Sequence, residues 1–90
     1  MKKISKIIVI GNKLGLHARP AAQLVQVASK FSSEILFARG EETVNAKSIM
    51  GVLMLAAPQG TALKVIVCGE DAPQALREIE ILVANKFGEE

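Results

Sequence analysis

The stretch over residues 4–31, ISKIIVIGNKLGLHARPAAQLVQVASKF, contains a strand pattern followed by a helix pattern. β-Branched residues dominate its start, and their alternation gives a predicted strand over residues 2–10 one apolar face. From Pro20 onward, apolar side chains recur at helical spacing, at Leu24, Val27, Ala28 and Phe31. A strand and a helix that each have one apolar face pack most simply as two layers, so this stretch predicts a helix lying on a sheet.

The remainder of the chain continues the alternation of strands and helices. Further strand patterns cover residues 34–39, 43–46 and 62–68. Two more helix patterns follow Ser48 and Asp71. The order βαββαβα, with no linker, predicts a single domain over residues 1–90. Its fold class is α+β, with a four-stranded antiparallel sheet and three helices on one face.

Polar residues and a glycine mark where the last two helices are expected to begin and end. Ser48 occupies an N-cap position. The apolar stripe after it consists of Ile49, Val52, Leu53 and Ala56. Asp71 is the predicted N-cap of the last helix, with Gln74 placed as in a capping box, and Gly88 predicts its end.

The composition excludes several classes of protein. Half of the 90 residues are hydrophobic, which is typical of a globular protein and not of a disordered one. Three Phe residues with no Trp or Tyr argue against a nucleic-acid module that stacks bases on aromatic rings. Cys68 and His17 are the only residues of their types, so no disulfide framework, metal cluster or cofactor is expected. In its predicted strand, Cys68 is interpreted as a small buried or half-buried apolar residue.

No segment has the length of a membrane-spanning helix, which needs about 20 mostly apolar residues. The longest uncharged apolar stretch covers residues 49–58, half of that length. Residues 7–10 are too few for the apolar part of a signal peptide, which takes about 7–15. We therefore predict a cytoplasmic protein without membrane insertion.

The net charge of +2 is unevenly distributed. Residues 1–30 carry six Lys or Arg and no acid, whereas residues 31–90 carry five Lys or Arg and all nine acids. Either the first third of the chain meets an anionic partner, or its lysines are ordinary solvated residues on a strand edge.

The segment GLHARPA, residues 15–21, joins the first strand to the first helix. Pro20 is suited to the first turn of that helix, whose N-cap is then His17 or Arg19. At either position the imidazole lies at a helix N-terminus, where free N–H groups and the helix dipole favour an anion. Arg19 adds a guanidinium suited to phosphate oxygens, and a neutral imidazole nitrogen is a nucleophile that positive surroundings help to keep neutral. These residues fit a histidine that accepts an anionic group, although a solvated or capping histidine is the alternative.

The segment NAKSIMG, residues 45–51, is the second unusual stretch. Ser48 is either a structural cap or a site where added phosphate would lie at the positive end of a helix dipole. Ile49, Met50 and Leu53 or Met54 either form an adaptable apolar patch for partners or fill the core.

At these two segments the sequence resembles HPr, the histidine-containing phosphocarrier family of the bacterial phosphoenolpyruvate-dependent phosphotransferase system. Residues 15–21 resemble the family's active-site signature, and residues 45–53, NAKSIMGVL, resemble its regulatory-serine segment. The resemblance runs from about residue 4 to the last helix, and two separate motifs make it specific.

The resemblance implies an open-faced β-sandwich and a phosphoryl carrier, not an enzyme. It implies that His17 takes a phosphoryl group on Nδ1 from phosphorylated enzyme I and passes it to the IIA domains of sugar permeases. Arg19 matches the family's active-site arginine, and Ser48 matches the serine that an ATP-dependent HPr kinase phosphorylates in some lineages. The partner-binding residues are expected to be Ile49, Met50, Leu53 and Ala22. The protein is expected to act as a monomer, with a transcriptional regulator as a further partner.

Other features leave the branch of the system open. Gln26 and Ser29 replace lysines of some enteric members, and residues 12–15, NKLG, resemble the nitrogen-related branch, whose carrier serves regulation. The KSIMG segment favours the sugar-type carrier, and His17 excludes the catabolite-repression paralogue that lacks the histidine. A purely regulatory binding module controlled through Ser48 is the alternative from another class, and a small nucleic-acid-binding domain is the least supported.

Overall fold

The computed structural model describes residues 2–89. Four strands and three helices alternate in the predicted order βαββαβα. Their bounds are β1 Lys3–Val9, α1 Ala18–Ser29, β2 Glu34–Arg39, β3 Glu42–Asn45, α2 Ile49–Met54, β4 Ala62–Cys68 and α3 Ala72–Ala84, followed by the short 3-10 turn η1 Lys86–Gly88. The predicted bounds of β2 and β4 are confirmed to the residue.

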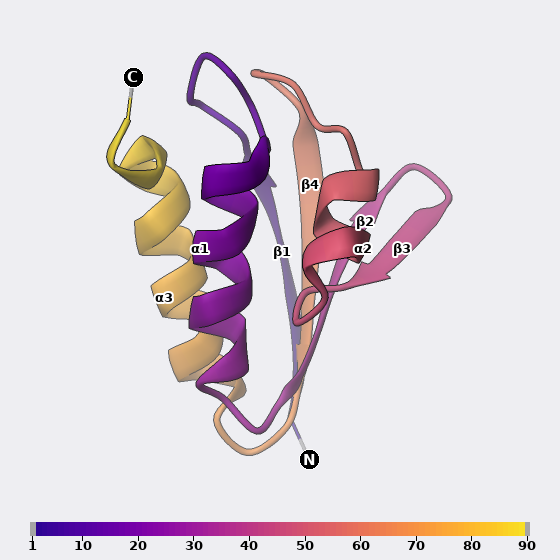
Figure 1. Ribbon diagram of the computed structural model, residues 1–90. Coiled ribbons are helices and arrows are strands. Elements are labelled where there is room, and N and C mark those ends of the chain that lie inside the picture. Colours follow the sequence, from indigo (N-terminus) through magenta and orange to yellow (C-terminus); the bar gives the residue numbers. More distant parts are fainter. Residues whose placement is uncertain (1, 90) are drawn as a thin grey trace.

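The four strands form one antiparallel sheet in the order β1-β4-β2-β3. All three helices lie on the same face of this sheet, with α1 between α3 and α2 (Figure 1). The fold is therefore the predicted open-faced sandwich of the α+β class. Because the edge strand β1 pairs antiparallel with β4, the loop after β1 and the loop before β4 meet at one end of the molecule (Figure 1).

The core lies between the sheet and the helices. Alternating side chains of the strands point toward the helices, as the period of two requires. The largest fully buried side chains include Ile10, Leu24, Ile35, Phe37, Val52, Leu55, Leu63, Val65, Val67 and Ile79. Cys68 is a half-buried free thiol at the end of β4, in agreement with its interpretation as a small apolar residue.

The helix α2 departs from the predicted stripe. It ends at Met54, and Ala56 has a positive φ of 49°, which takes its side chain out to solvent. Leu55 is buried in its place. The Arg39 guanidinium Nη1 donates to the carbonyl oxygens of Leu55 and Ala56 at 2.7 and 3.0 Å, which satisfies the end of the helix.

The helix α3 begins directly after Asp71, as predicted, but its capping contacts and its end differ from the prediction. Asp71 precedes the helix, but its side chain makes no cap hydrogen bond, so the predicted capping box with Gln74 is wrong. The carboxylate instead accepts hydrogen bonds from the backbone and hydroxyl groups of Ser32 and Ser33, which come from the loop before β2. The helix ends at Ala84 and not near Gly88, because the backbone from Lys86 to Gly88 has positive φ angles that cannot continue an α-helix.

The Asp71 contacts make the stability of the fold depend on pH. The hydroxyl of Ser33 and the amide of Ser32 lower the pKa of the Asp71 carboxyl from 3.8 to about 2. Because the folded-state pKa is depressed, the stabilisation is present above the unfolded-state pKa and is lost as the pH falls through the folded-state value. We expect Asp71→Asn to be less stable than wild type at neutral pH and to lose less stability between pH 3.8 and about 2.

Urea unfolding at a series of pH values measures this difference. Glu70→Gln, a change at the exposed neighbour, is the matched control and is expected to follow the wild-type pH profile. If Asp71→Asn loses stability across this acid range as steeply as wild type, the carboxylate does not contribute as described.

Candidate functional site

The segment GLHARPA covers the end of the loop between β1 and α1 and the first turn of α1. A turn from Asn12 to Gly15 closes with the Gly15 amide donating to the Asn12 carbonyl oxygen at 3.2 Å. Gly15 has a φ of +69°, and a Cβ added there would lie 2.8 Å from the Cα of Pro58, so the turn requires glycine on both counts. The Leu16 amide donates to the Ala57 carbonyl oxygen at 2.9 Å and ties this loop to the segment before β4. These bonds fix where the next residue, His17, enters the helix.

His17 is the N-cap of α1. Its backbone is extended, with φ −82° and ψ −170°, and the helix begins at Ala18. This result decides between the two predicted caps in favour of His17. The imidazole makes no cap hydrogen bond to the helix, and Pro20 in the first turn has no N–H. The first amides of α1 are thus left for an external acceptor, beside a ring that is 37% exposed.

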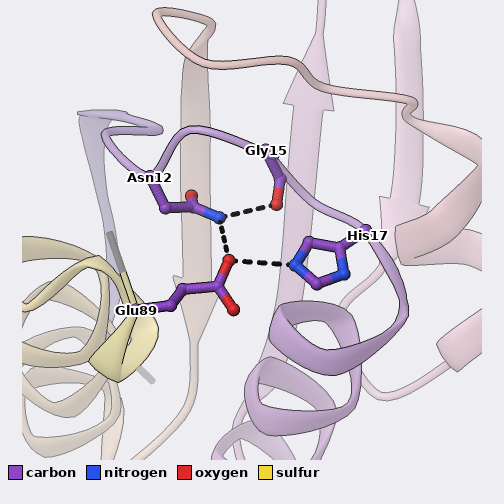
Figure 2. A network of polar contacts seen from close by, with 4 residues as sticks. All are labelled: Asn12, Gly15, His17 and Glu89. Atoms are coloured by element: carbon purple, nitrogen blue, oxygen red, sulfur yellow. Dashed lines mark hydrogen bonds and ion pairs between the residues drawn. The ribbon is translucent and has the colours of Figure 1, made fainter.

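An acid that the sequence analysis missed lies against His17. The Oε1 atom of Glu89 is 2.9 Å from Nε2 of the imidazole, and 2.8 Å from Nδ2 of the buried Asn12 (Figure 2). Hydrogen bonds from the His17 and Asn12 side chains lower the pKa of the Glu89 carboxyl. The expected positive surroundings of His17 therefore also include a carboxylate. No local pattern indicates this contact, because 72 positions separate the two residues in the sequence.

Arg19 lies in the first turn of α1 with its side chain exposed. The three ion pairs found among residues 2–89 do not involve it. Its charge contributes to lowering the pKa of the Glu89 carboxyl, after the larger effects of His17 and Asn12. Arg19 is thus a cation near the imidazole whose guanidinium is available to an incoming anion.

Ser48 is the N-cap of α2, as predicted. Its Oγ accepts a hydrogen bond from the Gly51 amide at 3.1 Å, and its backbone is extended. Lys47, beside it, donates from Nζ to the Phe31 carbonyl oxygen at 2.7 Å, which ties the start of α2 to the end of α1. The serine hydroxyl is half-buried in a position where the helix amides face it.

The outer face of α2 is apolar and exposed. Met50 is 66% and Met54 is 64% exposed, so these methionines are not core filler, and Ile49 is exposed as well. Leu53 and, on α1, Ala22 are half-buried. The two helices contact each other, so all of these candidate partner-binding residues lie on the helical layer (Figure 1).

No group of three or more His, Cys, Asp or Glu side chains within residues 2–89 is arranged to hold a metal ion. In the same part of the chain, no helix is long and apolar enough to cross a membrane.

Comparison with known proteins identifies the family. A family model described as the PTS HPr component phosphorylation site matches residues 4–85. The chain belongs to the HPr family. HPr proteins are phosphocarriers of the phosphotransferase system, so the two sequence motifs and the fold agree with the match.

Individual HPr relatives cover nearly the whole chain. The phosphocarrier protein HPr of Treponema pallidum (strain Nichols) is 49% identical over 87 residues, which are 97% of this chain and 99% of the relative. The crystal structure of HPr-C-His from Thermoanaerobacter tengcongensis is 49% identical, with a TM-score of 0.90 over 100% of this chain and 99% of that chain. The phosphocarrier protein NPr of Shewanella violacea is 43% identical over 99% of this chain and 98% of the relative.

Proposed function

We propose that this chain accepts a phosphoryl group from phosphorylated enzyme I on Nδ1 of His17 and passes it to the IIA domains of sugar permeases. The observation that carries this proposal is the half-exposed imidazole at the N-terminus of α1, with Glu89 on Nε2 and Nδ1 left uncovered by that contact (Figure 2). A neutral ring nitrogen with a free lone pair is a nucleophile for phosphorus.

The surroundings of His17 supply what phosphoryl transfer needs. Such transfer depends mainly on positioning and on stabilising the charge of the phosphoryl oxygens. In our proposal the first amides of α1 and the guanidinium of Arg19 take this role, without a metal or another cofactor. The protein is then a stoichiometric carrier, changed in each transfer and restored in the next, and not an enzyme.

The cellular location and the oligomeric state of the carrier follow from its proposed role. We propose that it works in the cytoplasm as a monomer, because one His17 in each chain is sufficient for the relay. Sedimentation of the phosphorylated and unphosphorylated protein tests the monomer, and a stable dimer in either state would contradict it.

Incubation of the protein with enzyme I and phosphoenolpyruvate tests the proposed function. We expect one phosphate per chain, labile to acid and stable to base, that a IIA domain then removes. A purely regulatory binding module would acquire no such phosphate, so this result decides between the two classes. Absence of acid-labile phosphate on the intact protein would overturn the proposal.

A carrier of the nitrogen-related branch is the second candidate, favoured by the likeness to NPr and by the NKLG loop ahead of His17. Transfer from the phosphorylated protein to a sugar-type IIA domain and to a nitrogen-type IIA domain, measured side by side, separates the branches. Our proposal predicts faster transfer to the sugar-type domain. Faster transfer to the nitrogen-type domain would assign the chain to the other branch.

We further propose that phosphorylation of Ser48 by an HPr kinase/phosphorylase regulates docking. A phosphate at this cap carries about −1.5 to −2 charges next to the exposed face of α2. Partners that use Met50 and its apolar neighbours should be repelled, and partners that present arginines, such as a transcriptional regulator, should be recruited.

Replacing Ser48 with aspartate should imitate part of this effect. We expect Ser48→Asp to slow transfer from enzyme I, while the melting temperature stays nearly unchanged or rises slightly, because an acid at a helix N-terminus is tolerated. Transfer kinetics and a melting curve measure the two effects.

The matched control is Gln74→Glu, which adds the same charge to the exposed first turn of α3 at the far end of the molecule. It should transfer at the wild-type rate. If Ser48→Asp and the true phosphoserine both transfer as fast as wild type, Ser48 is only a helix cap.

A further inference from the structure

A network of hydrogen bonds that includes a buried side chain, and not an isolated surface contact, holds Glu89 against His17. Asn12 is fully buried, and its Nδ2 donates both to the Gly15 carbonyl oxygen and to Oε1 of Glu89, each at 2.8 Å. Both partners are acceptors, so the orientation of the Asn12 amide is fixed by its hydrogen bonds. The carboxylate thus lies between a fixed amide and the imidazole (Figure 2).

The backbone after α3 places Glu89 in this position. Lys86, Phe87 and Gly88 have φ angles of 55°, 59° and 75°, three consecutive left-handed residues that turn the chain back toward the loop before α1. Such angles are costly for residues with side chains and persist where packing holds them. Phe87 is 3% exposed and belongs to the core, which anchors the turn. The next residue, Glu89, is itself only 20% exposed.

The contact determines which ring nitrogen of His17 carries hydrogen. The hydrogen bonds of Glu89 lower the pKa of its carboxyl, so the group is ionised near neutral pH and can only accept. The hydrogen between Oε1 and Nε2 therefore belongs to the imidazole. A neutral imidazole has one N–H, so Nδ1 carries the lone pair.

We propose that Glu89 is a positioning residue that holds His17 in the Nε2–H tautomer and presents the lone pair of Nδ1 to the incoming phosphoryl group. This inference rests on the proposed function. As Nδ1 forms its bond to phosphorus, the bond from phosphorus to the donor breaks and its electron pair leaves with the donor. The ring becomes cationic and keeps its proton on Nε2, where the carboxylate of Glu89 balances the charge. The reverse steps release the phosphoryl group to the acceptor.

A related carboxylate–histidine pair acts in hydrolases with the two ring nitrogens exchanged, and there too the acid fixes the tautomer and stabilises the imidazolium without taking the proton. Loss of hydrogen-bond partners that orient a functional histidine reduces activity by about 10–100-fold in metal sites. Because Glu89 and His17 are both partly exposed, we expect the lower end of this range, roughly tenfold.

The test compares Glu89→Ala and Glu89→Gln with wild type in the full chain, labelled with ¹⁵N at histidine. In wild type we expect the Nε2–H resonance of the unphosphorylated protein to be visible and protected from exchange with water. In both variants it should exchange rapidly, and in Glu89→Gln the side-chain amide can donate to Nε2 and shift hydrogen to Nδ1. The turnover rate in transfer from enzyme I should fall roughly tenfold with the KM for enzyme I unchanged, because Glu89 acts on the ring and not on docking.

Glu70→Ala, a change at an exposed glutamate before α3, is the control and should leave both readouts at wild-type values. A wild-type ring with its hydrogen on Nδ1 would overturn the proposal. So would a Glu89→Ala variant that transfers as fast as wild type, or faster, since faster transfer would make Glu89 a competitor for the ring. The NMR measurement uses unphosphorylated protein, so it decides the tautomer even if labelling with phosphoenolpyruvate refutes the proposed function.

Discussion

Replacing His17 with alanine is expected to abolish phosphoryl acceptance and to leave the fold intact. His17 is the only histidine of the chain, and no other side chain offers an imidazole nitrogen to phosphorus. Its side chain is 37% exposed and, among residues 2–89, hydrogen-bonds to Glu89 alone, so its removal opens no cavity in the core. Labelling with enzyme I and phosphoenolpyruvate measures acceptance, and a melting curve reports the fold.

Lys13→Ala is the matched control for this variant, because Lys13 is an exposed residue of the same loop. It should accept phosphate in full. Acid-labile phosphate on His17→Ala above background would show that another residue is the acceptor.

The second large effect is expected at Arg19. Removing one group that stabilises the charge of a transition state costs about 10²–10³ in rate, and we expect Arg19→Ala to slow transfer by this factor. The phosphate should still be found on His17. Rapid-mixing kinetics with phosphorylated enzyme I measure the rate, and the melting temperature should stay close to that of wild type because the side chain is exposed.

Two further variants make the Arg19 result specific. Arg19→Lys keeps the charge but loses the forked guanidinium, so its rate should lie between those of wild type and Arg19→Ala. Arg77→Ala removes an exposed arginine of α3 and should have no effect. Transfer by Arg19→Ala at the wild-type rate would mean that Arg19 is only a solvated residue.

The strands and the helix faces could be predicted because their signals are local. In β4, Leu63, Val65 and Val67 alternate strictly with exposed or half-buried residues, and the structure buries all three. In the predicted stripe of α1, Leu24 and Ala28 are fully buried and Val27 is half-buried, whereas Phe31 lies beyond the end of the helix. Periodicity of this kind follows from the geometry of each element and needs no knowledge of its neighbours.

The ends of the helices were predicted less well because they depend on contacts between distant segments. The Asp71 carboxylate accepts hydrogen bonds from Ser32 and Ser33 instead of from its own helix. The spacing of residues in the sequence does not predict these contacts. For α2, the left-handed conformation of Ala56 is stabilised in part by Arg39, 17 positions away in sequence.

The candidate site shows the same division. His17, Arg19 and Ser48 lie in two local motifs. The helix cap at Ser48 follows from its motif, whereas the first motif leaves His17 and Arg19 open as caps and the structure selects His17. Glu89 reaches the ring only through the turn of residues 86–88. The one signal for that turn was Phe87, an isolated apolar residue after the last helix, and an apolar residue alone does not indicate which loop the following carboxylate meets.

The most direct test of the account is NMR of the protein phosphorylated by enzyme I, with its histidine labelled with ¹⁵N. We expect that ³¹P couples to Nδ1 of His17, that Nε2 keeps its proton, and that the protein carries no second phosphorus atom. Phosphorus coupled to Nε2, the nitrogen that Glu89 contacts, or bound to any residue other than His17, would contradict it.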